Sequence, residues 1–171
     1  MTDQAPDTGE LTYTRVFDAP RELVFQAWTD PDHLAKWFGP AGFEMLAVKM
    51  DFRPGGVFLY GMRAPNGLEM WGKWVFRQID APEYLEFLQS FSDADGGIQR
   101  HPMAPGWPEE VLSTVRFTEE GGRTTLSMSG TPWNATEAEA TLFRDSIGGM
   151  NQGWKGTLDA FDAYLAKVQQ P

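Results

Sequence analysis

The sequence predicts an α+β fold in which one antiparallel sheet packs against helices, above all against a long C-terminal helix. Two observations carry this prediction. Between residues 43 and 131, short apolar segments, several of them alternating with polar residues, are separated by turns rich in Gly, Pro, Asn and Asp, which is typical of antiparallel strands. After residue 136, apolar residues recur every three or four positions, which is the period of a helix. A chain of 171 residues has the size of one domain, which we expect over residues 11–168 after a polar, flexible tail at residues 1–10.

The N-terminal part of this domain is expected to contain one strand and two short helices. Residues 11–17 alternate loosely between the two faces of a strand. Pro20 suits the first position of a helix and Glu22 suits its first turn, where the helix dipole favours a negative charge. The sequence Thr29-Asp30-Pro31 then interrupts the helical pattern and begins a second short helix.

The middle of the chain is expected to supply the rest of the sheet. A long segment at residues 92–110 contains three prolines and three glycines, and we interpret it as a loop. Loops of this length in compact domains are often functional. The predicted strands are residues 43–52, 57–63, 69–79, 84–92, 111–118 and 124–131.

The C-terminal part is predicted to be one long helix. Thr136 and Glu139 have the spacing of a capping box, and an apolar stripe follows from Phe143 to Leu165. A second stripe consists of small residues, although each glycine in a helix costs up to about 1 kcal/mol relative to alanine. Either the helix packs closely on the sheet along this stripe, or side chains are withheld so that a cavity stays open beside Trp154. The small residues are Gly149, Gly153, Gly156, Ala160 and Ala163.

Five short motifs follow one another in a characteristic order. They are RVFDAP with VFQAWT at residues 15–29, LAKWFGP at 34–40, RPGG at 53–56, IDAPEYL at 79–85 and GW at 153–154. With these motifs the chain, from about residue 11 to residue 167, resembles the SRPBCC superfamily, the helix-grip fold shared by START domains and birch-pollen-allergen-like proteins. Within that superfamily it is similar to the group named after the activator of the heat-shock chaperone ATPase (AHSA-like).

The resemblance makes the expected fold more specific. It implies a curved antiparallel sheet of about six to seven strands wrapped around the C-terminal helix, with two short helices after the first strand. Members of the superfamily commonly hold a cavity between the sheet and this helix. The resemblance also raises a chaperone-ATPase regulator as one candidate role, with a chaperone as the partner.

Charge and composition exclude several classes of function. Lys and Arg number 14 against 24 Asp and Glu, a net charge of −10 that repels nucleic acids. No apolar run approaches the roughly 18 residues of a membrane span, and the first ten residues do not have the pattern of a signal peptide. With no cysteine, two histidines and no nucleotide-binding motif, we expect a cytoplasmic protein without a metal or cofactor.

The aromatic content is the strongest indication of function. The chain has 12 Phe, 7 Trp and 4 Tyr, and such residues are enriched in cores and in ligand pockets. Among polar residues within or beside the aromatic segments, Arg63, Glu69, Gln89, Arg116 and Asn151 are candidates to orient a ligand. The residues predicted to line a cavity are Trp37, Phe58, Tyr60, Met62, Trp74, Phe87, Gln89, Phe91, Phe117, Met128, Met150, Asn151 and Trp154.

The function that we predict from these patterns is the binding or carriage of a small hydrophobic or aromatic ligand between the sheet and the C-terminal helix. One alternative is an enzyme of the cyclase, aromatase or hydrolase type that uses the same cavity, for which the sequence identifies no catalytic residue. The other is the chaperone-regulator or protein-interaction role. Whether the protein is a monomer or a homodimer stays open.

Overall fold

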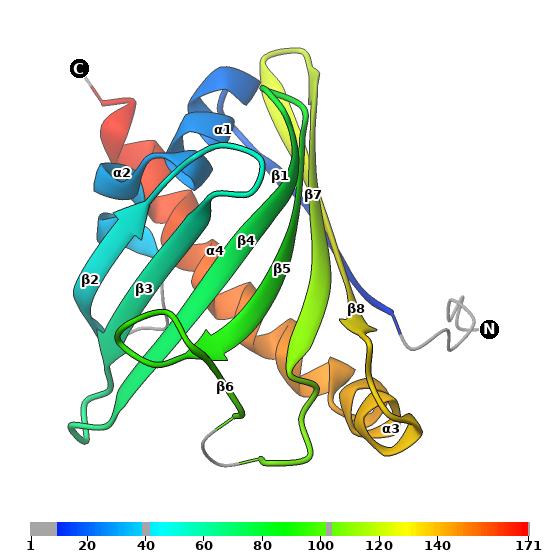
Figure 1. Cartoon of the computed structure of the whole chain (residues 1–171). Helices are drawn as coiled ribbons and strands as arrows, with labels where there is room; N and C mark the ends of the chain where they lie inside the picture. Colours follow the sequence, from blue (N-terminus) through cyan, green and yellow to red (C-terminus); the bar gives the residue numbers. More distant parts are fainter. Residues whose placement is uncertain (1–9, 39–41, 102–103, 171) are drawn as a thin grey trace.

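The computed structural model describes residues 10–38, 42–101 and 104–170, so residues 1–9 of the tail predicted at residues 1–10 lie outside the described residues. The described residues form eight strands and four helices (Figure 1). Their order is β1 (Leu11–Phe17), α1 (Arg21–Thr29), α2 (Pro31–Trp37), β2 (Glu44–Met50), β3 (Val57–Arg63), β4 (Glu69–Asp80), β5 (Tyr84–Ser92), β6 (Ile98–Gln99), β7 (Glu110–Glu120), β8 (Arg123–Trp133), α3 (Glu137–Asp145) and α4 (Ile147–Val168).

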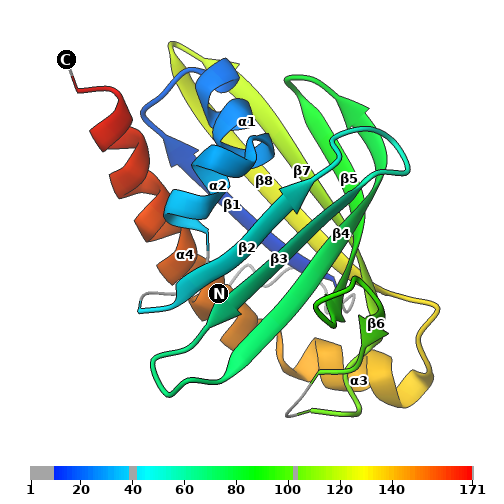
Figure 2. The ribbon, with the colours of Figure 1, turned by 60° about the vertical axis from the view of Figure 1, so that its left-hand side comes forward.

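The strands form one antiparallel sheet, and the α+β prediction is confirmed. The order across the sheet is β1-β8-β7-β5-β4-β3-β2, with the short β6 paired to β5. Figure 2 shows the sheet curving around α4, with α1 and α2 at one end of this helix and α3 at the other. All four helices therefore lie on the concave side, which is the helix-grip arrangement.

The core fills one end of this concave side. Trp28 of α1 is fully buried and lies at its centre. Its ring centroid is 5.3 Å from that of Trp37, 6.0 Å from that of Trp74 and 6.3 Å from that of Phe161 on α4. The two short helices thus act as a plug between α4 and the sheet, because their aromatic side chains occupy the space that the curvature encloses.

The prediction of one long helix after residue 136 is wrong in one respect. The predicted capping box is present, because the Thr136 side chain accepts from the Glu139 amide and the Glu139 carboxylate accepts from the Thr136 amide. However, α3 ends at Asp145, and Ser146 separates it from α4 while its hydroxyl donates to the Leu142 carbonyl. At this break the chain changes direction, and α3 lies across the open end of the sheet (Figure 1).

The explanation that small residues let α4 pack closely on the sheet is also wrong. Gly149, Gly153, Gly156, Ala160 and Ala163 are all exposed. A Cβ atom built on any of these three glycines would have no described atom of another element within 4 Å. The apolar stripe, rather than the small-residue stripe, faces the sheet.

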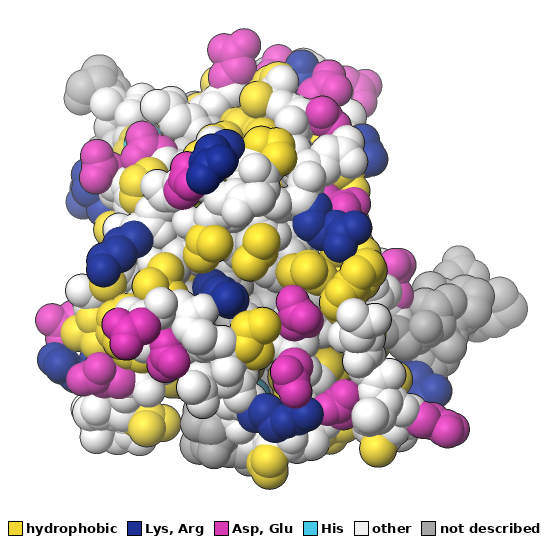
Figure 3. Space-filling model, in the orientation of Figure 1, with side chains coloured by type: hydrophobic (Ala, Val, Ile, Leu, Met, Phe, Trp, Pro, Cys, Tyr) yellow, Lys and Arg dark blue, Asp and Glu magenta, His cyan; other side chains and the backbone are white. Residues whose placement is uncertain are grey.

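The outer face of the sheet carries charges of both signs (Figure 3). Figure 3 views the outer face of β2, β3, β4 and β5, where acidic and basic side chains are interspersed with apolar ones. In the described part of the chain, no helix is long and apolar enough to cross a membrane. The charges on this outer face do not form a continuous basic surface of the kind that binds a phosphate backbone (Figure 3).

Candidate functional site

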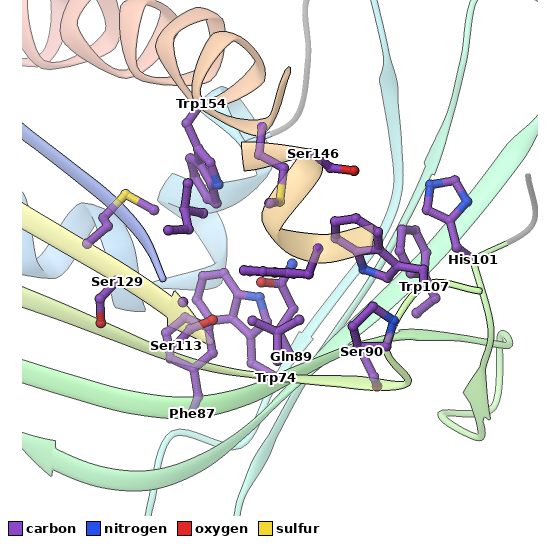
Figure 4. A pocket seen from close by; sticks show the side chains of 18 of the residues that line it. Trp74, Phe87, Gln89, Ser90, His101, Trp107, Ser113, Ser129, Ser146 and Trp154 are labelled. Atoms are coloured by element: carbon purple, nitrogen blue, oxygen red, sulfur yellow. The ribbon is translucent and has the colours of Figure 1, made fainter. Parts of the chain in front are cut away.

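The end of the concave side that the plug leaves open contains a cavity of about 530 Å³, the main cavity (Figure 4). In Figure 4, Trp154 projects from α4 toward the sheet, and Trp74, Phe87 and Gln89 face it from the strands. The long β5–β7 segment closes one side with His101 and Trp107. Further residues of the wall are Tyr60, Ser113, Met128, Phe143 and Met150.

A second cavity of about 280 Å³ lies between strands β3, β4 and β5 and helix α4. Tyr60, Phe91, Met150 and Trp154 border both cavities, so they form the partition between them. Because a methionine side chain changes shape easily, Met150 gives this partition an adaptable part. The other residues that line the second cavity are Phe38, Phe43, Met62, Met70, Trp71, Gly153 and Thr157.

The structure brings most of the predicted cavity residues together. Those at the main cavity are Tyr60, Trp74, Phe87, Gln89, Phe91, Met128, Met150 and Trp154. Met62 lies at the second cavity instead. Among the described residues, Trp37, Phe58, Phe117 and Asn151 belong to neither lining.

For three of these four, the correction has a clear physical reason. Trp37, Phe58 and Phe117 are almost fully buried in the core. Trp37 packs 4.3 Å from Phe161 between ring centroids, and Phe117 packs 5.2 Å from Phe25 of the plug. Alternation along a strand shows which face a side chain takes, but not which end of that face the helices fill.

The remaining polar candidates lie elsewhere. Arg63 is exposed and pairs with Glu44 at 3.5 Å and with Glu69 at 3.4 Å. Arg116 is exposed, with its guanidinium 4.7 Å from the centre of the Tyr84 ring. Asn151 is half-buried, outside both linings. Gln89 is therefore the one of the five predicted polar residues that borders a described cavity.

Gln89 is part of a polar cluster on the sheet wall, formed with Tyr60 and Trp74. Trp74 of β4 and Gln89 of β5 are direct cross-strand partners, so both side chains take the concave face. Tyr60 of β3 reaches them by crossing Gly72, where an added Cβ atom would lie 2.4 Å from the Tyr60 hydroxyl oxygen. Gly72 thus permits the close approach, and sequence reasoning missed it because its role depends on the register of β3 and β4.

The cluster presents donors at neutral pH. Burial raises the pKa of Tyr60 to about 12, more than the neighbouring Gln89 and Trp74 lower it, so the phenol keeps its proton. The Nε1 atom of Trp74 is buried and has no acceptor with acceptable hydrogen-bond geometry among the residues that the structure describes. Leaving a buried donor unpaired costs roughly 1–3 kcal/mol. Such a group calls for a ligand, a water molecule or another explanation.

The segment that closes the main cavity is fastened by Arg100, a residue that sequence reasoning also missed. Its guanidinium lies 2.7 Å from the Glu139 carboxylate of α3 and 2.9 Å from that of Glu109. It also donates to the carbonyl oxygens of Pro105 and Trp107, both at 3.3 Å. The ring of Trp107 then packs against Phe143 of α3, 5.3 Å between centroids. The described residues of this loop are therefore held in place against α3 by ion pairs, hydrogen bonds and ring packing.

His101 is the titratable histidine of this wall. Its ring centroid lies 4.7 Å from that of Phe91, and burial lowers the pKa of His101. The described lining of the main cavity contains no Lys or Arg, and its acidic residue, Glu109, is paired with Arg100. Chemically, the cavity offers apolar surface and neutral groups that can form hydrogen bonds.

Comparisons with known proteins agree with this architecture. The sequence model of the family described as Activator of Hsp90 ATPase homolog 1-like protein matches residues 18–166. Protein Ms6760 from Mycobacterium smegmatis has a similar structure, with 30% identity and a TM-score of 0.74 over 93% of this chain and 91% of that one. A protein from Arthrobacter aurescens is 26% identical, with a TM-score of 0.76 over 96% of this chain and 90% of the other.

The fold extends to more distant proteins. The AHSA1 protein from Silicibacter pomeroyi is 20% identical, with a TM-score of 0.70 over 94% of this chain and 99% of that one, a similarity that concerns the fold alone. No curated protein sequence matches the chain.

Proposed function

The chain belongs to the family of Activator of Hsp90 ATPase homolog 1-like proteins, and from that premise we propose that it binds a small hydrophobic or aromatic molecule in the main cavity. The family and the fold fit either ligand binding or regulation of a partner. The observation that favours ligand binding is the main cavity itself, with aromatic walls and the polar cluster of Tyr60, Trp74 and Gln89 on the sheet side. We propose the cytoplasm as the compartment, because a chain without cysteine fits a reducing environment.

The size and the wall of the main cavity support this proposal. Its volume of about 530 Å³ lies within the range of roughly 300–1,000 Å³ that is usual for small-molecule sites. The rings of Trp74 and Phe87 stack face to face with 4.2 Å between centroids and make a closely packed aromatic part of the wall. An aromatic wall opposite Trp154 suits an apolar or aromatic ligand, because aromatic rings pack well edge-to-face or with their faces offset.

The first test is native mass spectrometry of the purified protein before and after solvent extraction. We expect an adduct of a few hundred daltons that extraction removes. The stripped protein is then titrated with the neutral probe N-phenyl-1-naphthylamine while quenching of Trp fluorescence is followed, since Trp74 and Trp154 border the cavity.

A pair of variants assigns the binding to this cavity. Ser113 is buried, borders the cavity and pairs with Gly130 on β8, so Ser113→Leu fills part of the space. Ser127 lies on the same strand pair, opposite Arg116 on the other face, so Ser127→Leu is the matched control. We expect at least a tenfold weaker affinity for Ser113→Leu alone. No adduct and no quenching, or equal affinities of the two variants, would contradict the proposal.

A further inference from the structure

We propose that the main cavity selects neutral ligands that carry a hydrogen-bond acceptor, and that Trp74, Gln89 and Tyr60 recognise this acceptor by hydrogen bonding. The inference rests on the proposed function and names the chemical class of its ligand. A ketone or similar carbonyl oxygen, placed at the polar cluster while the rest of the molecule packs against the aromatic wall, would contact both parts of the lining.

The fixed position of the Trp74 donor carries the argument. Trp74 is 1% exposed, and its ring stacks on Phe87 and meets Phe58 edge-on, with 4.8 Å between centroids. Packing on both sides holds the ring, so the N–H cannot turn away to find another partner. Trp28 also has an unpaired Nε1 within the described residues, but it lies in the closed core, whereas Trp74 borders the cavity.

The chemistry of the three groups favours an acceptor on the ligand. The glutamine amide and the protonated phenol can each donate and accept, whereas the indole nitrogen can only donate, so Trp74 requires an acceptor that the other two groups can also serve with their N–H and O–H. Trp74 and Gln89 are cross-strand partners, and Tyr60 reaches them over Gly72. A carbonyl oxygen accepts two hydrogen bonds, so one ligand atom can satisfy the indole and one amide hydrogen together.

The lack of a positive charge in the described lining of the main cavity favours neutral acceptors over anionic ones. The described lining contains no Lys or Arg that could balance an anion, and the net charge of the chain is −10. Moving a carboxylate from water into such a wall without a counter-charge is strongly unfavourable. A neutral carbonyl keeps the same shape without that desolvation cost, so the cavity distinguishes acids from ketones.

Three probes of nearly identical shape test the inference. 2-Acetylnaphthalene has a ketone, 2-isopropenylnaphthalene has a CH₂ group in place of the carbonyl oxygen, and 2-naphthoate is the anion. With the stripped wild-type protein we expect the ketone to bind roughly three- to tenfold more tightly than the alkene, the usual effect of one or two hydrogen bonds. We expect the naphthoate to bind at least about 100-fold more weakly than the ketone.

The variants are compared through the ratio of the ketone and alkene affinities, because a change in cavity shape affects both probes alike. Trp74→Phe keeps an aromatic ring but removes the N–H, and Gln89→Met keeps the length but removes the amide. We expect both variants to bring the ratio close to one. Met128→Leu changes the lining without touching the polar cluster and is the control that keeps the wild-type ratio.

The outcomes separate this inference from the proposed function. If ketone and alkene bind the wild type equally, or if both Trp74→Phe and Gln89→Met keep the wild-type ratio, the polar cluster does not read the ligand, although the cavity still binds one. Tighter binding of the naphthoate overturns the charge argument. If neither these probes nor N-phenyl-1-naphthylamine binds, the proposed function and the inference both fail. A circular dichroism spectrum and a urea midpoint of each variant show that it is folded.

Discussion

The two halves of α4 have different surroundings although they form one continuous helix. In the C-terminal half, Thr157, Leu158, Phe161, Tyr164 and Leu165 are buried. In the N-terminal half, from Ile147 to Gly156, every described residue is exposed or half-buried, and four of the ten are glycines with no described atom near a built Cβ. One half holds the helix to the protein, and the other borders the two cavities.

One fold thus combines a rigid core with a cavity whose border can adapt its shape. Stability within a protein is not uniform, and segments with few buried contacts open at lower free energy than the core. Glycines add to this difference because each weakens a helix. The N-terminal half of α4 therefore combines both features beside the partition residues Met150 and Trp154.

The largest expected difference is in side-chain truncation. Phe161 is fully buried against Phe17, Trp28 and Trp37, so Phe161→Ala should cost roughly 3–5 kcal/mol of unfolding free energy. Met150→Ala should cost about 1 kcal/mol, because its side chain already borders two cavities and its loss leaves little new unfilled space. Urea unfolding measures both, and equal losses would contradict the division of the helix.

How far the sequence predicts this molecule depends on the range of the interaction. Strand bounds are local, and the predicted 57–63 and 84–92 agree with β3 and β5 residue by residue. The break at Ser146 was missed because a single intervening residue leaves the apolar spacing of three and four unchanged. The two glycines that follow it, Gly148 and Gly149, were the available signal for a weakened helix start.

The sequence predicts an aromatic cavity, but it does not show which aromatic residues line the cavity and which fill the core. Aromatic residues at alternate positions of a strand indicate one face, which brought Tyr60, Trp74 and Phe87 together as predicted. Phe117 has the same character but packs against Phe25 of the plug, and Trp37 is itself part of the plug and packs against Phe161, which only the packing of α1 and α2 decides. The Arg100 clamp joins partners from 5 to 39 residues away, a relation that no local pattern contains.

The next effect concerns opening of the helix. We expect backbone amides of residues 148–156 to exchange with deuterium through openings roughly 2–3 kcal/mol lower in free energy than those of residues 157–165. Hydrogen exchange with mass spectrometry measures this difference. A bound ligand should slow exchange in the first segment and leave the second unchanged. Uniform exchange along α4 would refute the comparison.

Smaller gains are expected from replacing the glycines. Gly153→Ala and Gly156→Ala should each raise the unfolding free energy by about 0.5–1 kcal/mol, because both positions are exposed and have room for a Cβ atom. Gly72→Ala is the matched control and should destabilise, since its Cβ atom would lie 2.4 Å from the Tyr60 hydroxyl. If the helix substitutions destabilise as well, these positions have packing partners that the comparison leaves out.

The smallest effect tests the ion pair that ties the C-terminal half to β1. The Asp159 carboxylate lies 2.7 Å from Arg15 and 3.0 Å from Lys155, and these bonds, with Arg15 first, hold the pKa of Asp159 below its ordinary 3.8. The second partner of Arg15, Asp162, is at 3.5 Å. Because the unfolded chain binds the proton more readily, this stabilisation is present above pH 3.8 and is lost as the pH falls through the lowered pKa.

Asp159→Asn should therefore lower the urea midpoint slightly at neutral pH, and the gap from the wild type should narrow as the pH falls below 3.8. Lys155→Gln is the control, since it removes the partner on the same helix and keeps the link to Arg15. A gap that persists unchanged at about pH 3 would mean that Asp159 acts through packing or helix propensity. The C-terminal half of α4 would then be attached to the rest of the protein by its buried side chains alone.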